Sequence, residues 1–279
     1  MYSKTAVSTQ SRKALALCYG GRHDGLLSVP PSRSRTVSTQ YFDVQAVDGA
    51  DLLTNTYQLR YQVFCIERRL LNWADYPECL ESDEFDAHAI HILARHKRGG
   101  DAGTVRLVLH SELGFPMQSH CAFDAELAHL NEPSSPVLRR YAEISRLAVS
   151  KDFRRRSCDT MYGSKPRGTQ RGALADGTGL PPPHGPEIVT GIFKYMYHES
   201  KRIGITHWIV AMERGLSLLL RRMGFPFKAA GPEADYSGCV RPYIASIADI
   251  ERYCSHHRPT MFAYMSHGLH GGPEVAHIN

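Results

Sequence analysis

Between residues 49 and 256 the hydrophobic pattern changes repeatedly between the spacing of a helix and the alternation of a strand. Residues 49–68 carry apolar side chains at helical intervals and are predicted to form an amphipathic helix. Residues 87–95 and 102–109 read as strands, and the polar turn 97–101 between them is typical of a hairpin. A chain with both periods in succession is neither an all-helical bundle nor an all-β sandwich.

The same patterns continue after the hairpin. Residues 141–149 are predicted to form a third strand. Helices are then predicted over 187–202, 216–223 and 247–256, and strands over 206–212, 225–229 and 241–246. This order predicts an α/β or α+β layer fold, in which helices flank a mixed sheet.

The length of 279 residues allows one substantial core, and we expect a single domain over residues 40–258. Residues 1–39 hold six Lys or Arg side chains and one acid, so this disordered basic extension alone accounts for the net charge of +5. The remaining body is formally neutral, which does not favour a nucleic-acid partner. Residues 160–186 are rich in Gly and Pro and read as a flexible insertion, and residues 259–279 as a C-terminal tail.

No stretch approaches the roughly 18 unbroken apolar residues of a membrane span, and Ala14–Leu17 is too short for a signal peptide. We therefore expect a cytoplasmic protein with no transmembrane segment. The seven cysteines are scattered without a Cys-x-x-Cys pair, as in a protein with reduced thiols. His88, His91 and His96 lie close together, but a strand would divide them between its faces, so no metal site is expected.

An acid and a base lie inside one predicted strand, in the segment Glu143-Ile-Ser-Arg146. Glu143 and Arg146 would point to opposite faces of a regular strand, whereas Ser145 would share the face of Glu143. A β-bulge would bring the acid and the base together and leave a backbone N–H for the oxyanion that forms from a thioester carbonyl. Glu143 is then a candidate base for an amine nucleophile. An ion pair that holds the strand to a helix fits the same spacing.

A second acidic group precedes the hairpin. Asp83 and Asp86 are three residues apart, so one helical turn would project both carboxylates the same way toward an ammonium group or another cation. Glu81 and Glu84 beside them also fit a solvated loop that caps a neighbouring element. Arg106 lies inside a predicted strand, where an unpaired charge would be costly, so we expect it to pair with a carboxylate or a substrate.

Two further groups suit an acyl donor. The charged run after residue 150 fits a phosphopantetheine phosphate or the acidic face of an acyl carrier protein, although a solvated surface has the same pattern. Its basic members are Lys151, Arg154, Arg155 and Arg156. Phe64 and Trp73 are candidates to line an acyl pocket, or they belong to the core.

Taken in order, these motifs resemble those of the acyl-homoserine-lactone synthases and, more closely, of acyltransferases associated with PEP-CTERM/exosortase systems. The similarity runs from about Tyr41 to Arg258. Its motifs are Leu59-Arg-Tyr-Gln-Val-Phe64, Asp83-Glu-Phe-Asp86-Ala-His88, Gly103-Thr-Val-Arg-Leu-Val108, Glu143-Ile-Ser-Arg-Leu-Ala-Val-Ser150, Gly204-Ile-Thr-His-Trp208 and Leu219-Leu-Arg-Arg-Met-Gly224. The resemblance implies a GNAT-like fold, with a mixed, mainly antiparallel sheet flanked by helices.

The resemblance also implies an N-acyltransferase that moves a fatty acyl group from a carrier thioester to the amine of an amino-acid-like acceptor. In that family pattern the acids serve the acceptor and the arginines brace them. The implied acceptor-binding residues are Asp83, Asp86, Arg60 and Arg106, the implied catalytic residues are Glu143, Arg146 and Ser145, and the implied acyl-pocket residues are Phe64 and Trp73.

The chain departs from this family pattern in two places. The Gly-rich loop that binds CoA diphosphate in acetyl-CoA-dependent relatives is absent between Arg156 and Glu187, so an acyl carrier protein is favoured over acyl-CoA as donor. Trp73 lies in a longer loop than in the lactone synthases, which weakens the assignment of S-adenosylmethionine as acceptor. No bound cofactor is expected. The alternative functions are a lactone (autoinducer) synthase that uses S-adenosylmethionine and a non-catalytic acyl-carrier or lipid-binding module.

Overall fold

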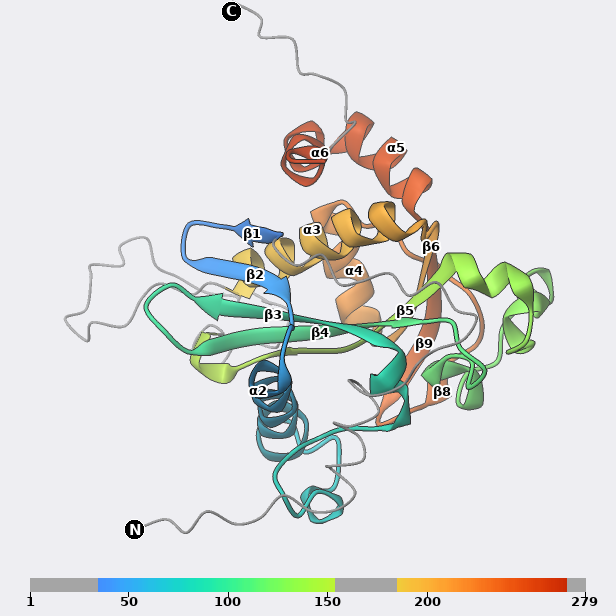
Figure 1. Ribbon diagram of the computed structural model, residues 1–279. Helices are drawn as coiled ribbons and strands as arrows, with labels where there is room; N and C mark the ends of the chain where they lie inside the picture. The colour runs from blue at the N-terminus through green and yellow to red at the C-terminus, as the bar shows by residue number, and fades with distance from the viewer. Residues whose placement is uncertain (1–34, 154–184, 270–279) are drawn as a thin grey trace, which may run out of the picture. The chain divides into compact units, whose positions relative to one another are not determined.

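The computed structural model describes residues 35–153 and 185–269 (Figure 1). The chain divides into two compact units. The first unit lies within Met1–Arg106 and Arg146–Ile192, and the second within Leu107–Ser145 and Phe193–Asn279. Three elements contribute residues to both units. They are β4 (Asp101–Leu109), β5 (Tyr141–Val149) and α3 (Gly185–Ile203).

The first unit is built on neighbouring strands. β1 (Thr36–Ser38) pairs antiparallel with β2 (Phe42–Ala46), β2 pairs antiparallel with β3 (Ala89–His96), and β4 lies beside β3. The register between β2 and β3 sets Val44 opposite Ala94 and Gln45 opposite Leu93. Because successive residues of a strand point to opposite faces, Val44 and Leu93 lie on different faces of this part of the sheet.

A helix covers each of these two faces. Leu59 of α2 (Ala50–Tyr61) packs in a buried cluster with Leu93, and Figure 1 shows α2 beside β3 and β4. On the other face Gly191 of α3 lies so close to Val44 that an added Cβ would be 3.1 Å from the Val44 Cγ2 atom. The first unit therefore has a helix on either side of its strands.

The helix predicted over residues 49–68 changes its hydrogen bonding before it ends. After α2 the chain continues as a π-helix, η1 (Gln62–Glu67), and the N–H of Arg68 donates to the carbonyl of Val63 at 2.9 Å. The N–H of Leu70 then donates to the carbonyl of Phe64 at 2.8 Å. Short π segments occur often at functional sites, because the wider turn redirects the side chains around it.

The second unit contains a parallel pair of strands. β5 pairs parallel with β6 (His207–Met212), and β6 pairs antiparallel with β9 (Cys239–Ser246). The short strands β7 (Lys228–Ala229) and β8 (Ala234–Asp235) pair antiparallel with β9. Trp208 is fully buried and donates from Nε1 to the Ser200 hydroxyl at 2.9 Å, which joins β6 to α3.

Three further helices belong to the second unit: α4 (Arg214–Met223), α5 (Ile247–His257) and α6 (Pro259–Ser266). Gly224 ends α4 with a left-handed φ of 111°, a conformation that glycine adopts readily. His198 of α3 contacts the carbonyl of Met265 at 2.6 Å, and the Lys194 ammonium lies 4.4 Å from the centre of the Tyr264 ring. These contacts fix α6 against α3.

Short 3-10 helices occupy several connections. Those of the first unit are η2 (Trp73–Asp75), η3 (Glu84–His88) and η7 (Lys151–Phe153). Those of the second unit are η4 (Pro116–Ser119), η5 (Ala125–Asn131) and η6 (Pro136–Arg140), which lie in a stretch for which the sequence pattern predicted neither helix nor strand.

The predicted fold class is confirmed, since helices flank strands whose pairing is mixed and mostly antiparallel. The strand predicted over 225–229 is wrong for its first half, because Pro226 has no N–H for a strand ladder. The expected tail at 259–279 is corrected at its start, where Pro259 fits the first turn of α6. β1 likewise replaces the end of the expected extension 1–39, and the insertion 160–186 lies outside the described residues apart from the start of α3.

Replacement of Gly231 by Ala should destabilise the second unit. A Cβ at this position would lie 2.1 Å from the backbone carbonyl oxygen of Ala122, so backbone must shift to admit it. We expect the free energy of unfolding, measured by urea denaturation, to fall by about 1–3 kcal/mol.

The matched control is Gly215→Ala in α4, where no atom lies within 4 Å of an added Cβ. This change should leave the free energy of unfolding unchanged or raise it by about 0.5–1 kcal/mol. Equal effects of the two substitutions would contradict the close approach at Gly231.

Candidate active site

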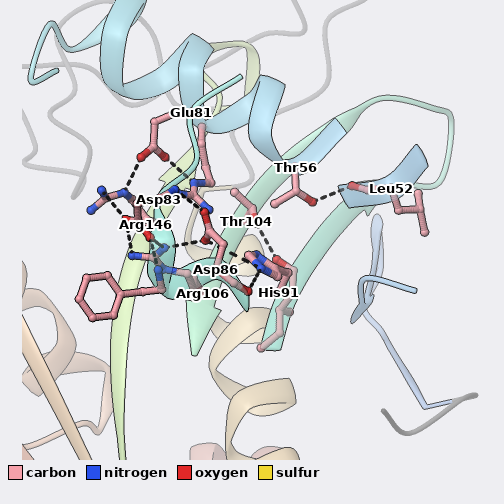
Figure 2. A network of polar contacts seen from close by, with 12 residues as sticks. Leu52, Thr56, Glu81, Asp83, Asp86, His91, Thr104, Arg106 and Arg146 are labelled. Carbon is pink, nitrogen blue, oxygen red and sulfur yellow. Dashed lines mark hydrogen bonds and ion pairs between the residues drawn. The ribbon is translucent and has the colours of Figure 1, made fainter. Parts of the chain in front are cut away.

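Three arginines and three acids form a closed ring of ion pairs within the first unit, part of which is drawn in Figure 2. In ring order they are Arg60, Glu81, Arg146, Asp83, Arg106 and Asp86. Each member pairs with the two members of opposite charge on either side of it. We call this arrangement the charged ring, and it has no net charge when all six groups are ionised.

Arg60 is the fully buried member contributed by α2. Its Nε atom donates to Glu81 at 2.5 Å and its Nη1 atom donates to Asp86 at 2.7 Å. Burial lowers the pKa of Arg60, but the charges of Asp86 and Glu81 outweigh burial and hold this pKa above its ordinary value. The Arg60 guanidinium also lies 5.2 Å from the centre of the Tyr57 ring, as in a cation–π contact.

Arg106 is fully buried in β4 and joins the two aspartates. It contacts both carboxylate oxygens of Asp83, and its Nη1 atom also donates to Asp86 at 2.6 Å. A two-oxygen contact of this kind fixes the orientation of both groups as well as their distance. The expected pairing of Arg106 with a carboxylate is therefore present.

Arg146 belongs to the part of the charged ring that reaches the surface. Its Nε atom donates to Glu81 at 2.9 Å and its Nη2 atom donates to Asp83 at 3.1 Å. The side chains of Arg146 and Asp83 are 18% and 19% exposed, whereas those of Arg60, Glu81, Arg106 and Asp86 are 3% exposed or less. The Asp83–Arg146 pair is the exposed edge of the charged ring.

The backbone of η3 holds the two aspartates as well. Asp83 accepts a hydrogen bond from the N–H of Phe85 at 3.0 Å, and Asp86 accepts one from the N–H of Asp83 at 2.8 Å, which together form a capping box. Every carboxylate oxygen of Glu81, Asp83 and Asp86 thus accepts a hydrogen bond. Glu81 and Asp86 therefore belong to the protein interior and not to a solvated loop, whereas Asp83 is partly exposed.

The electrostatics of the buried acids follow from these contacts. Burial raises the pKa of Asp86, but Arg60 and Arg106 lower it more, so the net pKa lies below its usual range. Burial also raises the pKa of Glu81, and Arg60 and Arg146 bring it below its ordinary value. Both carboxylates are therefore ionised at neutral pH.

His91 of β3 contacts the charged ring through the backbone of Asp86. Its Nε2 atom lies 3.2 Å from the Asp86 carbonyl oxygen, and its ring meets that of Tyr57 edge to face. Burial lowers the pKa of His91 to about 4, against the opposing charge of Asp86. His91 is therefore neutral at pH 7. In the described part of the chain, the buried Nδ1 atom of His91 and Nη2 atom of Arg60 have no hydrogen-bond partner.

Glu143 and Ser145 lie in the second unit, on the first half of β5. Glu143 is 1% exposed, and its Oε2 atom accepts a hydrogen bond from the N–H of Met117 in η4 at 2.9 Å. Burial and the charge of Glu143 raise the pKa of the nearby Cys121 thiol to about 11, so this thiol stays protonated. Ser145 is half-buried.

The backbone of β5 departs from strand geometry just after Ser145. Arg146 has a φ of 54°, in the left-handed region that residues other than glycine seldom adopt. Such a residue interrupts the alternation of side chains along a strand, as a β-bulge does. The spacing of Glu143 and Arg146 in the sequence anticipates an interruption of this kind.

The residues predicted for the donor and the acyl chain lie outside the charged ring. Phe64 is half-buried and packs against the cluster that contains Leu59, whereas Trp73 is 63% exposed. The N–H of Lys151 donates to Glu67 at 3.1 Å. Arg154, Arg155 and Arg156 fall outside the described residues.

Two members of this site, Glu81 and His91, were not predicted as site residues from the sequence. Glu81 was grouped with Glu84 as a loop acid, yet Glu81 is fully buried and Glu84 is exposed. The sequence signal that separates them is their position relative to the capping residue Asp83. Glu84 follows the cap as the first residue of η3, whereas Glu81 precedes it. His91 carries a weaker signal, because a histidine inside a buried strand usually has a polar partner.

Comparisons with known proteins agree with this fold. Residues 59–163 match the family model described as an acetyltransferase (GNAT) domain. The crystal structure of TofI in a ternary complex with an inhibitor and MTA is 17% identical, covers 79% of this chain and 99% of its own, and has a TM-score of 0.51. At this identity the likeness shows a shared fold, which is therefore GNAT-like.

Two other solved structures are similar at a lower level. The AHL synthase LasI is 16% identical over 74% of this chain and 90% of its own, with a TM-score of 0.48. FeeM, an N-acyl amino acid synthase from uncultured soil microbes, is 10% identical over 76% of this chain and 94% of its own, with a TM-score of 0.44. No curated protein matches the chain.

Two further findings concern the described residues alone. Among residues 35–153 and 185–269, no group of three His, Cys, Asp or Glu side chains is arranged to hold a metal ion. Within the same ranges, no helix has the length and apolar character of a membrane span.

The free energy of unfolding should fall as the pH drops below about 6.5. The pKa of His91 is lower in the folded protein than in the unfolded chain, so the unfolded chain binds the proton first. The contribution of neutral His91 to the free energy of unfolding is fully present above the pKa of the unfolded chain. It is lost as the pH falls toward about 4, for a total of about 3 kcal/mol. The depressed pKa values of Asp86 and Glu81 act in the same direction at lower pH.

The measurement is urea denaturation at pH 7 and pH 5 for the wild type and for His91→Gln. The variant should lose most of the stability difference between these two pH values. His256→Gln replaces an exposed histidine of α5 and should keep the wild-type dependence. A His91→Gln variant with an unchanged dependence would show that His91 is not the group that titrates.

Proposed function

We propose that this protein is an N-acyltransferase that moves a fatty acyl group from an acyl carrier protein thioester to the amine of an amino-acid-like acceptor. The observation that carries this proposal is the exposed edge of the charged ring. Asp83 and Arg146 present a carboxylate and a guanidinium side by side, the two charges that complement an ammonium and a carboxylate on one small molecule. Within this proposal the chain is related to the acyltransferases associated with PEP-CTERM/exosortase systems.

The acceptor would bind by exchange rather than by filling an open acidic site. Every carboxylate oxygen of the charged ring already accepts a hydrogen bond, so an incoming ammonium must replace a donor. The contact between Asp83 and Arg146 is the one at the surface, and its distance of 3.1 Å is the longest in the ring. Its loss leaves Arg146 attached to Glu81 and Asp83 attached to Arg106.

Glu143 is the residue that we assign to proton removal from the acceptor amine, directly or through water. Its carboxylate is held by the N–H of Met117, which orients it and leaves it a proton acceptor. Ser145 is assigned to the same reacting centre. Cys121 is unsuited to act as a nucleophile, because its raised pKa keeps the thiol protonated at neutral pH.

The donor side of the proposal depends on charge and hydrophobic contact. Lys151, followed by Arg154, Arg155 and Arg156, would meet the acidic surface and the phosphopantetheine phosphate of a carrier protein. Phe64 and Trp73 would contact the acyl chain, and the exposed Trp73 ring is accessible to it. No resident cofactor takes part, since the thioester is itself a substrate.

The direct test incubates the purified full chain with acyl carrier protein that carries a long-chain acyl group and with a panel of amino acids. We expect an amide product by mass spectrometry with at least one acceptor, and acyl-CoA should be a poorer donor than the carrier thioester. Absence of an amide in every pairing would overturn the proposal. A requirement for S-adenosylmethionine, with release of methylthioadenosine, would instead identify a lactone synthase.

Glu143→Gln separates a catalytic base from a group that only holds η4. The amide oxygen of Gln can still accept the hydrogen bond from Met117, but the side chain no longer takes a proton. We expect kcat to fall by about 10²–10⁴-fold with the melting temperature almost unchanged. A variant with wild-type turnover would exclude Glu143 as the base.

A further inference from the structure

We infer that Glu81 is a positioning residue that holds Arg146 in the orientation needed at the exposed edge of the charged ring. This inference rests on the proposed function. Glu81 is not assigned as a catalytic residue, because both of its carboxylate oxygens already accept hydrogen bonds from arginines, Arg60 and Arg146. It acts through Arg146, whose side chain reaches the surface.

Glu81 is anchored more firmly than the residue it holds. Its N–H donates to the carbonyl of Tyr57 at 3.2 Å, which ties this stretch of chain to α2. Its Oε2 atom accepts from the Nε atom of Arg60 on the same helix at 2.5 Å. The second oxygen, Oε1, is then directed at Arg146. The position of the Arg146 side chain is thus set by a helix on which Arg146 does not lie.

The Nε and Nη2 atoms of Arg146 donate to two carboxylates that differ in burial. The Nε atom donates to buried Glu81 at 2.9 Å, while the Nη2 atom donates to half-buried Asp83 at 3.1 Å. If the Asp83 contact is given up to an acceptor, the contact to Glu81 remains and still holds the guanidinium. The pKa of Glu81 lies below its ordinary value, so this carboxylate stays charged throughout.

The backbone of Arg146 supplies the second reason for such a restraint. Its φ of 54° is unfavourable for a residue with a Cβ, so the conformation persists only where the surroundings fix the side chain. The fully buried Glu81 carboxylate provides such a restraint, and it is more deeply buried than Asp83. Without it, Arg146 can return to regular strand geometry, and its guanidinium then leaves the exposed edge.

The test is a double-mutant cycle between Glu81 and Arg146, read in kcat and KM for the acyl transfer. Glu81→Gln keeps the shape of the side chain, but its amide places an N–H group against one of two arginine donors. We expect kcat to fall by about 10- to 100-fold with KM within about threefold, as for a displaced group in the reacting centre. Glu84→Gln changes an exposed acid of the same segment and should match the wild type.

The decisive comparison is made in the Arg146→Ala background. If Glu81 acts through Arg146, then Glu81→Gln should change kcat/KM by less than about twofold once the guanidinium is absent. If the effects of the two substitutions multiply, Glu81 has a general structural role and the inference is overturned. Should Glu81→Gln fail to fold, Glu81→Asp keeps the charge with a shorter reach and enters the same cycle.

The result also separates this inference from the proposed function. An inactive wild type with every donor and acceptor overturns the proposed function, and the role of Glu81 falls with it. An active wild type with independent effects of the two substitutions overturns only the role of Glu81. Non-additive effects in an active enzyme support both.

Discussion

The charged ring is the constraint on which the first unit depends. Removing a guanidinium from water is costly, and Arg60 and Arg106 are both fully buried. The ring offsets this cost by giving each guanidinium two carboxylates and by leaving no net charge. Loss of one member would leave two neighbours of like charge without their shared partner. These ion pairs hold four parts of the chain together, namely α2, the segment 81–86, β4 and β5.

Such a ring combines rigidity with one place where it can be opened. Four of its six members are almost completely buried, and the two exposed members are adjacent in the ring. Low local dielectric strengthens the contacts inside, whereas water weakens the contact at the surface. In the proposed function, a charged acceptor would compete with the protein at the Asp83–Arg146 pair, and the buried remainder of the ring would preserve the geometry during the exchange.

Much of the fold was accessible from the sequence, because hydrophobic period is a local property. The limits of β5 agree with the prediction, and the charged members Arg60, Asp83, Asp86, Arg106 and Arg146 were all selected. Glu81 was missed because its burial depends on contacts with Arg60 and Arg146, which are 21 and 65 residues away in the chain. The same holds for α6, whose contacts with Lys194 and His198 lie 60 residues or more away in the chain.

The left-handed backbone conformation in β5 occurs at Arg146, a residue whose side chain belongs to the charged ring. Glycine would adopt a φ of 54° at little cost, but glycine has no guanidinium to offer Glu81 and Asp83. The ion pairs of the Arg146 side chain with Glu81 and Asp83 offset the cost of the strained backbone conformation. Glu143, three residues earlier on the same strand, is fixed separately by the N–H of Met117. One interrupted strand thus carries the assigned base and the assigned acceptor-binding arginine, each restrained by a partner from a different element.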